Sequence, residues 1–225
     1  MTSHTRCGIL YFIPYRVIPL ISGCYYHLFN RGVEKRPIFT SKRDFERFAQ
    51  TLYYYQFSGP KPKFSNKLRF SKNQFDSNPK IVEIIAYCFM PNHFHLLIKQ
   101  SGDDGIQEFI RKVQNSYTKY FNIRYQRVGP LLQGPFKAVL VESDDQLLHL
   151  SRYIHLNPYV SELVDNLELY PYSSYRSYIN LSDDILCVSA EIVRLLGNND
   201  YKEFVQDHAN YAVELEQIEH IVIDD

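Results

Sequence analysis

The chain has 225 residues, of which 45% are hydrophobic and 22% charged, and its 25 basic side chains equal its 25 acidic ones in number. These proportions exclude an intrinsically disordered chain and fit one globular domain of ordinary size with extensions. The zero formal net charge argues against a partner that is attracted by the overall electrostatic field.

The cysteines and the N-terminal apolar run indicate the cellular compartment in which we expect the protein. Four cysteines lie far apart, at positions 7, 24, 88 and 187, without a C-x-x-C pair. This argues against a zinc knuckle and a disulfide framework. The apolar run of residues 8–21 contains two prolines and an arginine and is too short to span a bilayer. We therefore expect a cytoplasmic protein that is associated at most with a bacterial nucleoid, and no membrane partner.

The first part of the chain predicts a strand, a helix and a loop. Residues 24–29 favour a strand that ends at the turn-like Asn30-Arg31-Gly32. Ser41 can cap a helix whose apolar residues recur at helical spacing. These residues are Phe45, Phe48, Leu52 and Tyr55. The basic stretch 57–80 breaks the periodicity and predicts a long loop.

A hairpin follows. Residues 81–89 favour a strand, and Pro91-Asn92 supplies a turn into a second strand that begins at His93.

A second helix and a fourth strand come next. The helix begins within residues 102–105 and stops before Gly129-Pro130. Residues 131–141 favour a strand with a bulge or bend at Gly134-Pro135. The resulting order of strand, helix, strand, strand, helix, strand predicts an α+β fold: a ferredoxin-like antiparallel sheet with helices on one face.

A third helix is predicted from Gln146 to about Leu156, where Asn157-Pro158 breaks or kinks it. Two more helices are expected near 188–197 and 200–217. The predicted organisation is an N-terminal extension (1–22), a main domain (23–180) and a C-terminal helical appendage (181–225).

The most informative motif is the run MPNHFHLLI at residues 90–98, which places two histidines on either side of Phe94. Strand side chains alternate between faces, so His93 and His95 point the same way. Two imidazoles side by side on a strand form half of a divalent-metal site. The alternative is that both are ordinary structural residues of a sheet.

The third helix supplies a possible second half of this site. His149, Tyr153 and Asn157 are spaced by four residues and therefore share one face of the helix. A tyrosine hydroxyl and an amide oxygen on that face could meet the paired histidines.

These two motifs together resemble the single-tyrosine HUH transposases, most closely their REP-associated tyrosine transposase branch. The resemblance covers residues 24–178 and includes the run GPLLQG at 129–134 with Phe136 and Lys137. The family usually has a basic residue after the glycine, where this chain has Pro135. At that position this chain departs from the family pattern, and the resemblance does not imply a DNA contact there.

The resemblance implies a role for each site residue. His93 and His95 would ligate a divalent metal, Mg²⁺ or Mn²⁺, and Tyr153 would be the nucleophile. Asn157 would be the third ligand, with His149 as its rival and a helix-end cap as the alternative role of Asn157. The implied reaction cleaves and rejoins single-stranded DNA, plausibly carrying a hairpin, through a 5′-phosphotyrosine.

The basic residues Arg31, Lys112, Lys119 and Lys137 are candidates for contacts with the DNA backbone. For each of them, a solvated surface charge is the alternative interpretation.

Two other function classes compete with the enzyme. One is a domesticated DNA-binding protein of the same fold that has lost its catalysis. The other is a ferredoxin-like interaction module with structural histidines. Both a monomer and a homodimer are compatible with the sequence.

Overall fold

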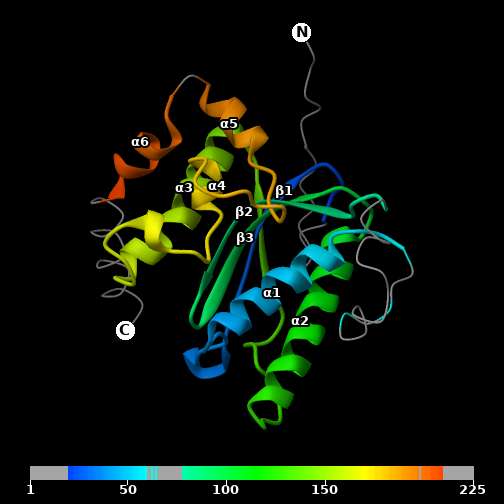
Figure 1. Cartoon of the computed structure of the whole chain (residues 1–225). Helices are drawn as coiled ribbons and strands as arrows, with labels where there is room; N and C mark the ends of the chain where they lie inside the picture. Colours follow the sequence, from blue (N-terminus) through cyan, green and yellow to red (C-terminus); the bar gives the residue numbers. More distant parts are fainter. Residues whose placement is uncertain (1–19, 60–61, 63, 65–77, 198, 210–225) are drawn as a thin grey trace, which may run out of the picture.

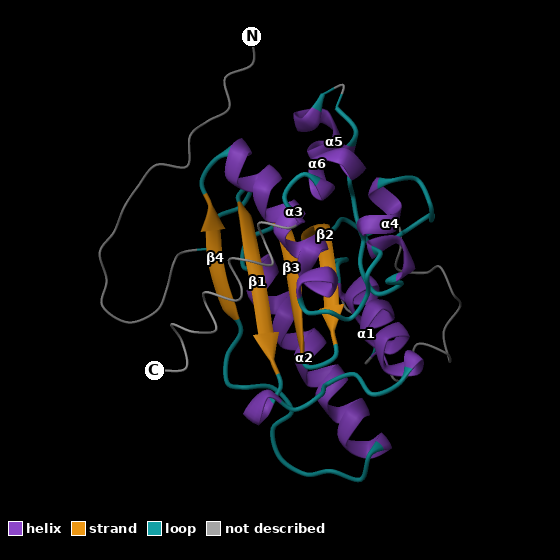
Figure 2. Cartoon of the chain, turned by 90° about the vertical axis from the view of Figure 1, so that its left-hand side faces the viewer, coloured by secondary structure: helices purple, strands orange, loops and turns teal. Residues whose placement is uncertain are grey.

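A four-stranded antiparallel sheet organises the structure, a computed structural model that describes residues 20–59, 62, 64, 78–197 and 199–209. The strands are β1 (Tyr25–Arg31), β2 (Val82–Met90), β3 (His93–Gln100) and β4 (Lys137–Val141), in the order β2-β3-β1-β4. Figure 2 shows them side by side. Helix α1 (Lys42–Tyr55) connects β1 to β2, and α2 (Gly105–Arg124) connects β3 to β4. The predicted ferredoxin-like order is confirmed.

The two faces of the sheet carry different helices (Figure 1). Phe48 of α1 contacts Phe94 of β3 with 5.1 Å between ring centroids, whereas Tyr153 of α3 (Asp144–Val160) lies 5.7 Å from the His95 ring. Phe94 and His95 are consecutive in β3 and therefore point to opposite faces. Helices α1 and α2 thus cover one face, as predicted, and α3 covers part of the other.

The core between the sheet and α1/α2 is aromatic. Phe48 is fully buried and contacts the rings of Phe39, Phe89, Phe94 and Tyr117 at 4.9–5.2 Å between centroids. Tyr117 is itself buried and donates its hydroxyl to the Ile38 carbonyl. Tyr117 therefore packs α2 against the sheet.

The N-terminus of α1 is fixed by a capping box. Ser41 and Asp44 bond reciprocally, as the sequence around Ser41 predicts. The Asp44 carboxylate is fully buried and also accepts hydrogen bonds from Tyr120 and Tyr125 of the α2 end. Burial would raise the pKa of this carboxyl, but the bonds from Tyr125, Thr40, Tyr120 and Ser41 outweigh it and hold the pKa below its usual value.

The fourth strand is shorter than predicted. Regular pairing begins only at Lys137, and before it Leu132 forms a single bridge to Gly32. Gly134 has φ of +69°, so the backbone bends there and leaves the strand geometry. The predicted bend at Gly134-Pro135 is confirmed.

The third helix is longer than predicted. Asn157 and Pro158 lie inside α3, which continues to Val160. A proline removes one backbone donor, and here it does so in the last turn, where Ser161 still bonds to the Asn157 carbonyl. The expected break at Asn157-Pro158 is therefore wrong.

The region after residue 160 contains short elements. They are η3 (Leu167–Leu169), α4 (Tyr175–Tyr178), α5 (Ala190–Leu196) and α6 (Tyr201–Gln206), while η1 (Val33–Lys35) follows β1. Helices α5 and α6 pack against α3. The expected helices near 188–197 and 200–217 correspond to α5 and α6, but α6 is shorter, and residues 210–217 lie outside the described residues, as do 1–19 and most of the 57–80 loop.

Candidate functional site

Three histidines gather on the sheet face opposite to α1 and α2. His93 and His95 stand two residues apart on β3, with 5.0 Å between their ring centroids and 88° between their planes. In the register, β1 pairs Arg31 with His93 and Phe29 with His95. His27 therefore shares this face, and its ring lies 5.1 Å from that of His95.

His27 fixes the orientation of the His95 ring. Nε2 of His27 lies 2.9 Å from Nδ1 of His95, which is 7% exposed. This hydrogen bond occupies one ring nitrogen of His95 and leaves Nε2 for a ligand. A partner on the far nitrogen is the usual way in which a metal-binding imidazole is oriented. His27 is not among the residues predicted from the sequence, because local spacing does not reveal the pairing of β1 with β3.

Burial keeps these imidazoles neutral. It lowers the pKa of His27 and of His93 to about 4, and the pKa of His95 well below its ordinary value. The charges of His93 and His27 lower the His95 pKa further. Neutral imidazoles have a free lone pair at pH 7, as metal binding requires.

His93 contacts one residue of the hairpin turn, Asn92, and one residue of α3, Asn157. Its Nδ1 lies 2.6 Å from Oδ1 of Asn92 in the hairpin turn. Burial is the largest effect on the pKa of His93 and lowers it, whereas a side-chain hydrogen bond with Asn157 raises it. Asn157 also donates Nδ2 to the Tyr153 carbonyl at 2.8 Å, which fixes its amide. His93 and Asn157 are thus brought together from β3 and α3.

Tyr153 lies at the edge of the histidine cluster and is 52% exposed. Its ring is 5.7 Å from His95 and 6.1 Å from His27, at nearly right angles to both. The hydroxyl-bearing side chain is therefore close to the histidines of its own chain and open to an incoming substrate.

His149 is hydrogen-bonded to Arg152 of its own helix. Its Nδ1 lies 2.7 Å from the Arg152 guanidinium, and Arg152 reaches His208 at 2.8 Å and the Phe204 carbonyl at 3.3 Å. His149 lines a cavity of about 320 Å³ together with His27 and Tyr153. His149 therefore lies near Tyr153, but its hydrogen bond is to Arg152, which contacts α6.

A buried histidine anchors α3 to the rest of the protein. Nδ1 of His155 lies 2.8 Å from the Tyr201 hydroxyl, and Nε2 lies 2.7 Å from Ser174 Oγ. Ser174 in turn accepts the backbone N–H of Tyr87 in β2 at 2.8 Å. This chain of bonds ties the helix that carries Tyr153 to the sheet that carries His93 and His95.

The four basic candidates separate into two pairs. Arg31 and Lys137 flank the histidines: Arg31 opposes His93 in the register, and Lys137 lies 5.7 Å from the Phe29 ring. Lys112 and Lys119 belong to α2, on the other side of the sheet. A single DNA track on one face cannot include all four.

The metal site stays a prediction, and the donor types present are compatible with a divalent ion. Two neutral imidazoles and an amide converge from β3 and α3, and oxygen and nitrogen donors suit Mn²⁺ and Mg²⁺. Among the described residues, no group of three or more histidine, cysteine, aspartate or glutamate side chains forms a metal site. An asparagine would therefore have to complete this one.

Comparison with known proteins agrees with this geometry. Residues 68–157 match the family model described as "Transposase IS200 like", and this segment includes His93, His95, Tyr153 and Asn157. A Haemophilus influenzae protein provisionally named a REP-associated tyrosine transposase is 29% identical over 103 residues, which are 41% of this chain and 58% of that protein. The match thus spans little more than half of the relative.

The fold agrees as well. The solved structure of a REP-associated tyrosine transposase bound to a REP hairpin superposes with a TM-score of 0.53 at 15% identity, over 79% of this chain and 98% of that one.

The class that fold and site define is a ferredoxin-like protein with a histidine pair and a helical tyrosine on one sheet face. Within that class, the predicted resemblance is confirmed: residues 68–157 match the IS200-like transposase model, and the chain is similar to a protein named as a REP-associated tyrosine transposase.

The buried histidine of α3 predicts a sensitivity to acid. Burial lowers the pKa of His155 from 6.5 to about 3. Between these pH values His155 is protonated in the unfolded chain and neutral in the folded protein. The free energy of unfolding should therefore fall with decreasing pH in this window, by up to about 1.4 kcal/mol per pH unit from this residue. Urea unfolding of His155→Gln between pH 7 and 4 should give a shallower decrease than the wild type. Equal slopes would refute the assignment.

Proposed function

We propose that the protein is a metal-dependent transposase that cleaves and rejoins single-stranded DNA through Tyr153. The observation that carries this proposal is the 5.7 Å separation of the Tyr153 and His95 rings within one chain, beside His93 and Asn157. The match of residues 68–157 to the IS200-like transposase model supports this proposal.

The chemistry follows from a tyrosine hydroxyl next to a phosphodiester. The Tyr153 oxygen attacks phosphorus and loses its proton, a new O–P bond forms, and the bond to the 3′ oxygen breaks. The products are a 5′-phosphotyrosine and a 3′-hydroxyl that takes up a proton. Attack of a 3′-hydroxyl on the phosphotyrosine reverses the step and joins strands without an external energy source.

His93, His95 and Asn157 would hold the divalent ion, with His149 as the competing ligand. When bound, such an ion polarises the phosphorus and offsets the charge that develops on the phosphate oxygens. The protein contributes orientation: His27 fixes the His95 ring, Asn92 fixes that of His93, and α3 fixes Tyr153 and Asn157.

The substrate we propose is single-stranded DNA with a hairpin, because the related solved transposase is bound to a REP hairpin. Arg31 and Lys137 lie where the strand would approach Tyr153. None of the described helices is long and apolar enough to cross a membrane.

The competing function is DNA binding without catalysis. The four motif residues lie together at one face of the sheet, and this favours the enzyme. A protein that had lost catalysis would not need to keep them together. They are His93, His95, Tyr153 and Asn157.

Removing the nucleophile should abolish the covalent product. Tyr153→Phe keeps the ring but lacks the attacking oxygen, so no adduct should form with a labelled hairpin oligonucleotide and Mn²⁺ on a denaturing gel. Tyr159→Phe, on the same helix, is the matched control and should form the adduct. Adduct formation by Tyr153→Phe would contradict the proposal, and binding without any adduct in the wild type would favour the competing function.

The third ligand can be identified by titration. Asn157→Ala should raise the Mn²⁺ concentration needed for half-maximal cleavage, because the amide contacts His93. His149→Ala should shift it less, because His149 is bonded to Arg152. The reverse order would make His149 the ligand.

His27 should act on the metal through His95. Loss of a partner that orients a metal-binding histidine typically weakens metal binding about 10- to 100-fold. Mn²⁺ affinity, measured by electron paramagnetic resonance without DNA, should fall in His27→Leu and recover in part in His27→Gln, whose side chain can still accept the hydrogen bond from His95. Unchanged affinity in His27→Leu would remove the role assigned to His27.

A further inference from the structure

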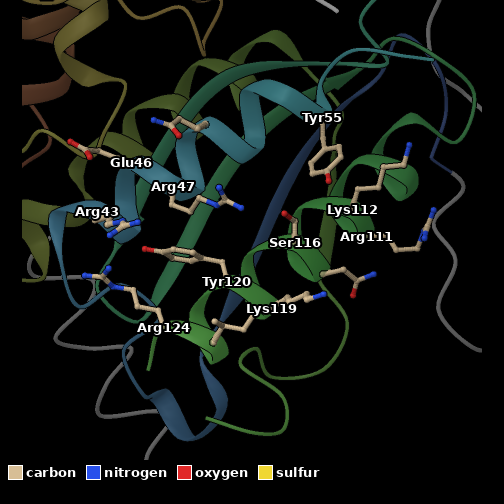
Figure 3. Close-up of a pocket in the computed structure, with 13 residues that line it drawn as sticks. Arg43, Glu46, Arg47, Tyr55, Arg111, Lys112, Ser116, Lys119, Tyr120 and Arg124 are labelled. Carbon is tan, nitrogen blue, oxygen red and sulfur yellow. The ribbon is translucent and has the colours of Figure 1, made fainter. Parts of the chain in front are cut away.

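A second concentration of charge lies between α1 and α2 (Figure 3). These helices cover the sheet face opposite to the one that Tyr153 contacts. The two helices form a groove of about 960 Å³, here named the α1/α2 groove. Its basic residues are Arg43 and Arg47 of α1 and Arg111, Lys112, Lys119 and Arg124 of α2. Glu46 is the acidic residue among those that line it. A wall with this excess of positive charge attracts an anion.

Half of these six cations are exposed and form no salt bridge with a described acidic residue. Lys112 pairs with Glu108, and Arg124 lies 3.5 Å from the buried Asp44. Within the described residues, Arg43, Arg111 and Lys119 form no salt bridge and are exposed. The charge of the groove is therefore available to a ligand.

Arg47 gives a second indication that the groove binds an anion. Its guanidinium lies 4.2 Å from the Phe64 ring and 5.2 Å from the Tyr120 ring. Its Nε is buried and has no hydrogen-bond partner among the described residues. A buried donor without an acceptor is destabilising, so an anion that enters the groove would be stabilised here.

The cations are arranged for an extended ligand. Arg111 and Arg124 are separated by about 20 Å along α2, as the helical rise dictates, with Lys119 between them. Arg43 and Arg47 lie one turn apart on the facing helix. Figure 3 shows labelled cations on both walls of the groove. A small phosphate would contact one end of this row, whereas a polyanion can follow all of it.

Double-helical DNA fits better than a single strand. Single strands are held by aromatic rings on which bases stack, but the Tyr120 ring is covered by Arg47 and its hydroxyl is bonded to Asp44. What the groove offers is two rows of cations on helices packed about 8–10 Å apart. Such rows contact phosphates and need no exposed bases, and a duplex presents its phosphates in this way.

We propose that the α1/α2 groove binds the phosphate backbone of double-helical DNA, namely the stem of the hairpin substrate. This inference rests on the proposed function for the identity of its ligand. It divides the substrate between two faces: the stem contacts α1 and α2, and the single strand contacts the histidine face. It also explains why Lys112 and Lys119 lie far from Arg31 and Lys137.

The test uses the full chain and a blunt hairpin that has no single-stranded overhang. Arg43→Gln/Arg111→Gln removes one exposed cation from each wall. Fluorescence anisotropy should give an affinity about five- to tenfold weaker than the wild type. The slope of log affinity against log salt should decrease by about 1.8, since two phosphate contacts are lost. Thermal unfolding of the variant should match the wild type.

Arg194→Gln/Lys202→Gln removes the same charge from α5 and α6 and should change neither the affinity nor the slope. Unchanged binding in the groove variant would overturn the proposal, and so would an equal loss of affinity for a stemless single strand. Failure of the proposed function is distinguishable, because it appears as absence of the tyrosine adduct in the wild type, whatever the hairpin affinity of the groove variant.

Discussion

The arrangement of the site depends on how α3 is docked against the sheet. His155 is fully buried between the Tyr201 hydroxyl and Ser174, and Ser174 holds the backbone of β2 at Tyr87. Tyr153 and Asn157 lie on this helix on either side of His155 in sequence. Their distances to the β3 histidines are therefore set by an anchor that itself contacts no substrate. If α3 shifted by one turn, about 5.4 Å, neither side chain would reach the histidines.

The same dependence explains what the sequence could and could not predict. The hairpin, the helix capped by Ser41 and the pairing of His93 with His95 on one face follow from local periodicity and turn residues. His27 could not be found in this way, because its contact with His95 joins strands 68 residues apart. The early end assigned to α3 failed because a proline in a last turn removes one backbone donor and does not stop the helix.

Sequence spacing places the candidate site residues of α3 on one helix face but does not rank them. His149, Tyr153 and Asn157 share a helix face in the sequence, and only tertiary contacts separate them: Arg152 draws His149 toward α6, while Asn157 meets His93. The basic residues show the same limit. Arg31 and Lys112 look equivalent in sequence, yet the sheet lies between them. The two faces give the protein two separate electrostatic surfaces despite its zero net charge.

The proposed chemistry requires that the Tyr153 oxygen, beside the histidines of its own chain, forms the covalent bond to DNA. Mass spectrometry of the protein after reaction with a hairpin oligonucleotide and Mn²⁺ tests this most directly, since tryptic cleavage after Arg152 and Arg176 isolates the segment 153–176. We predict that fragmentation places the nucleotide phosphate on Tyr153. A nucleotide on any other tyrosine of the chain would contradict the account.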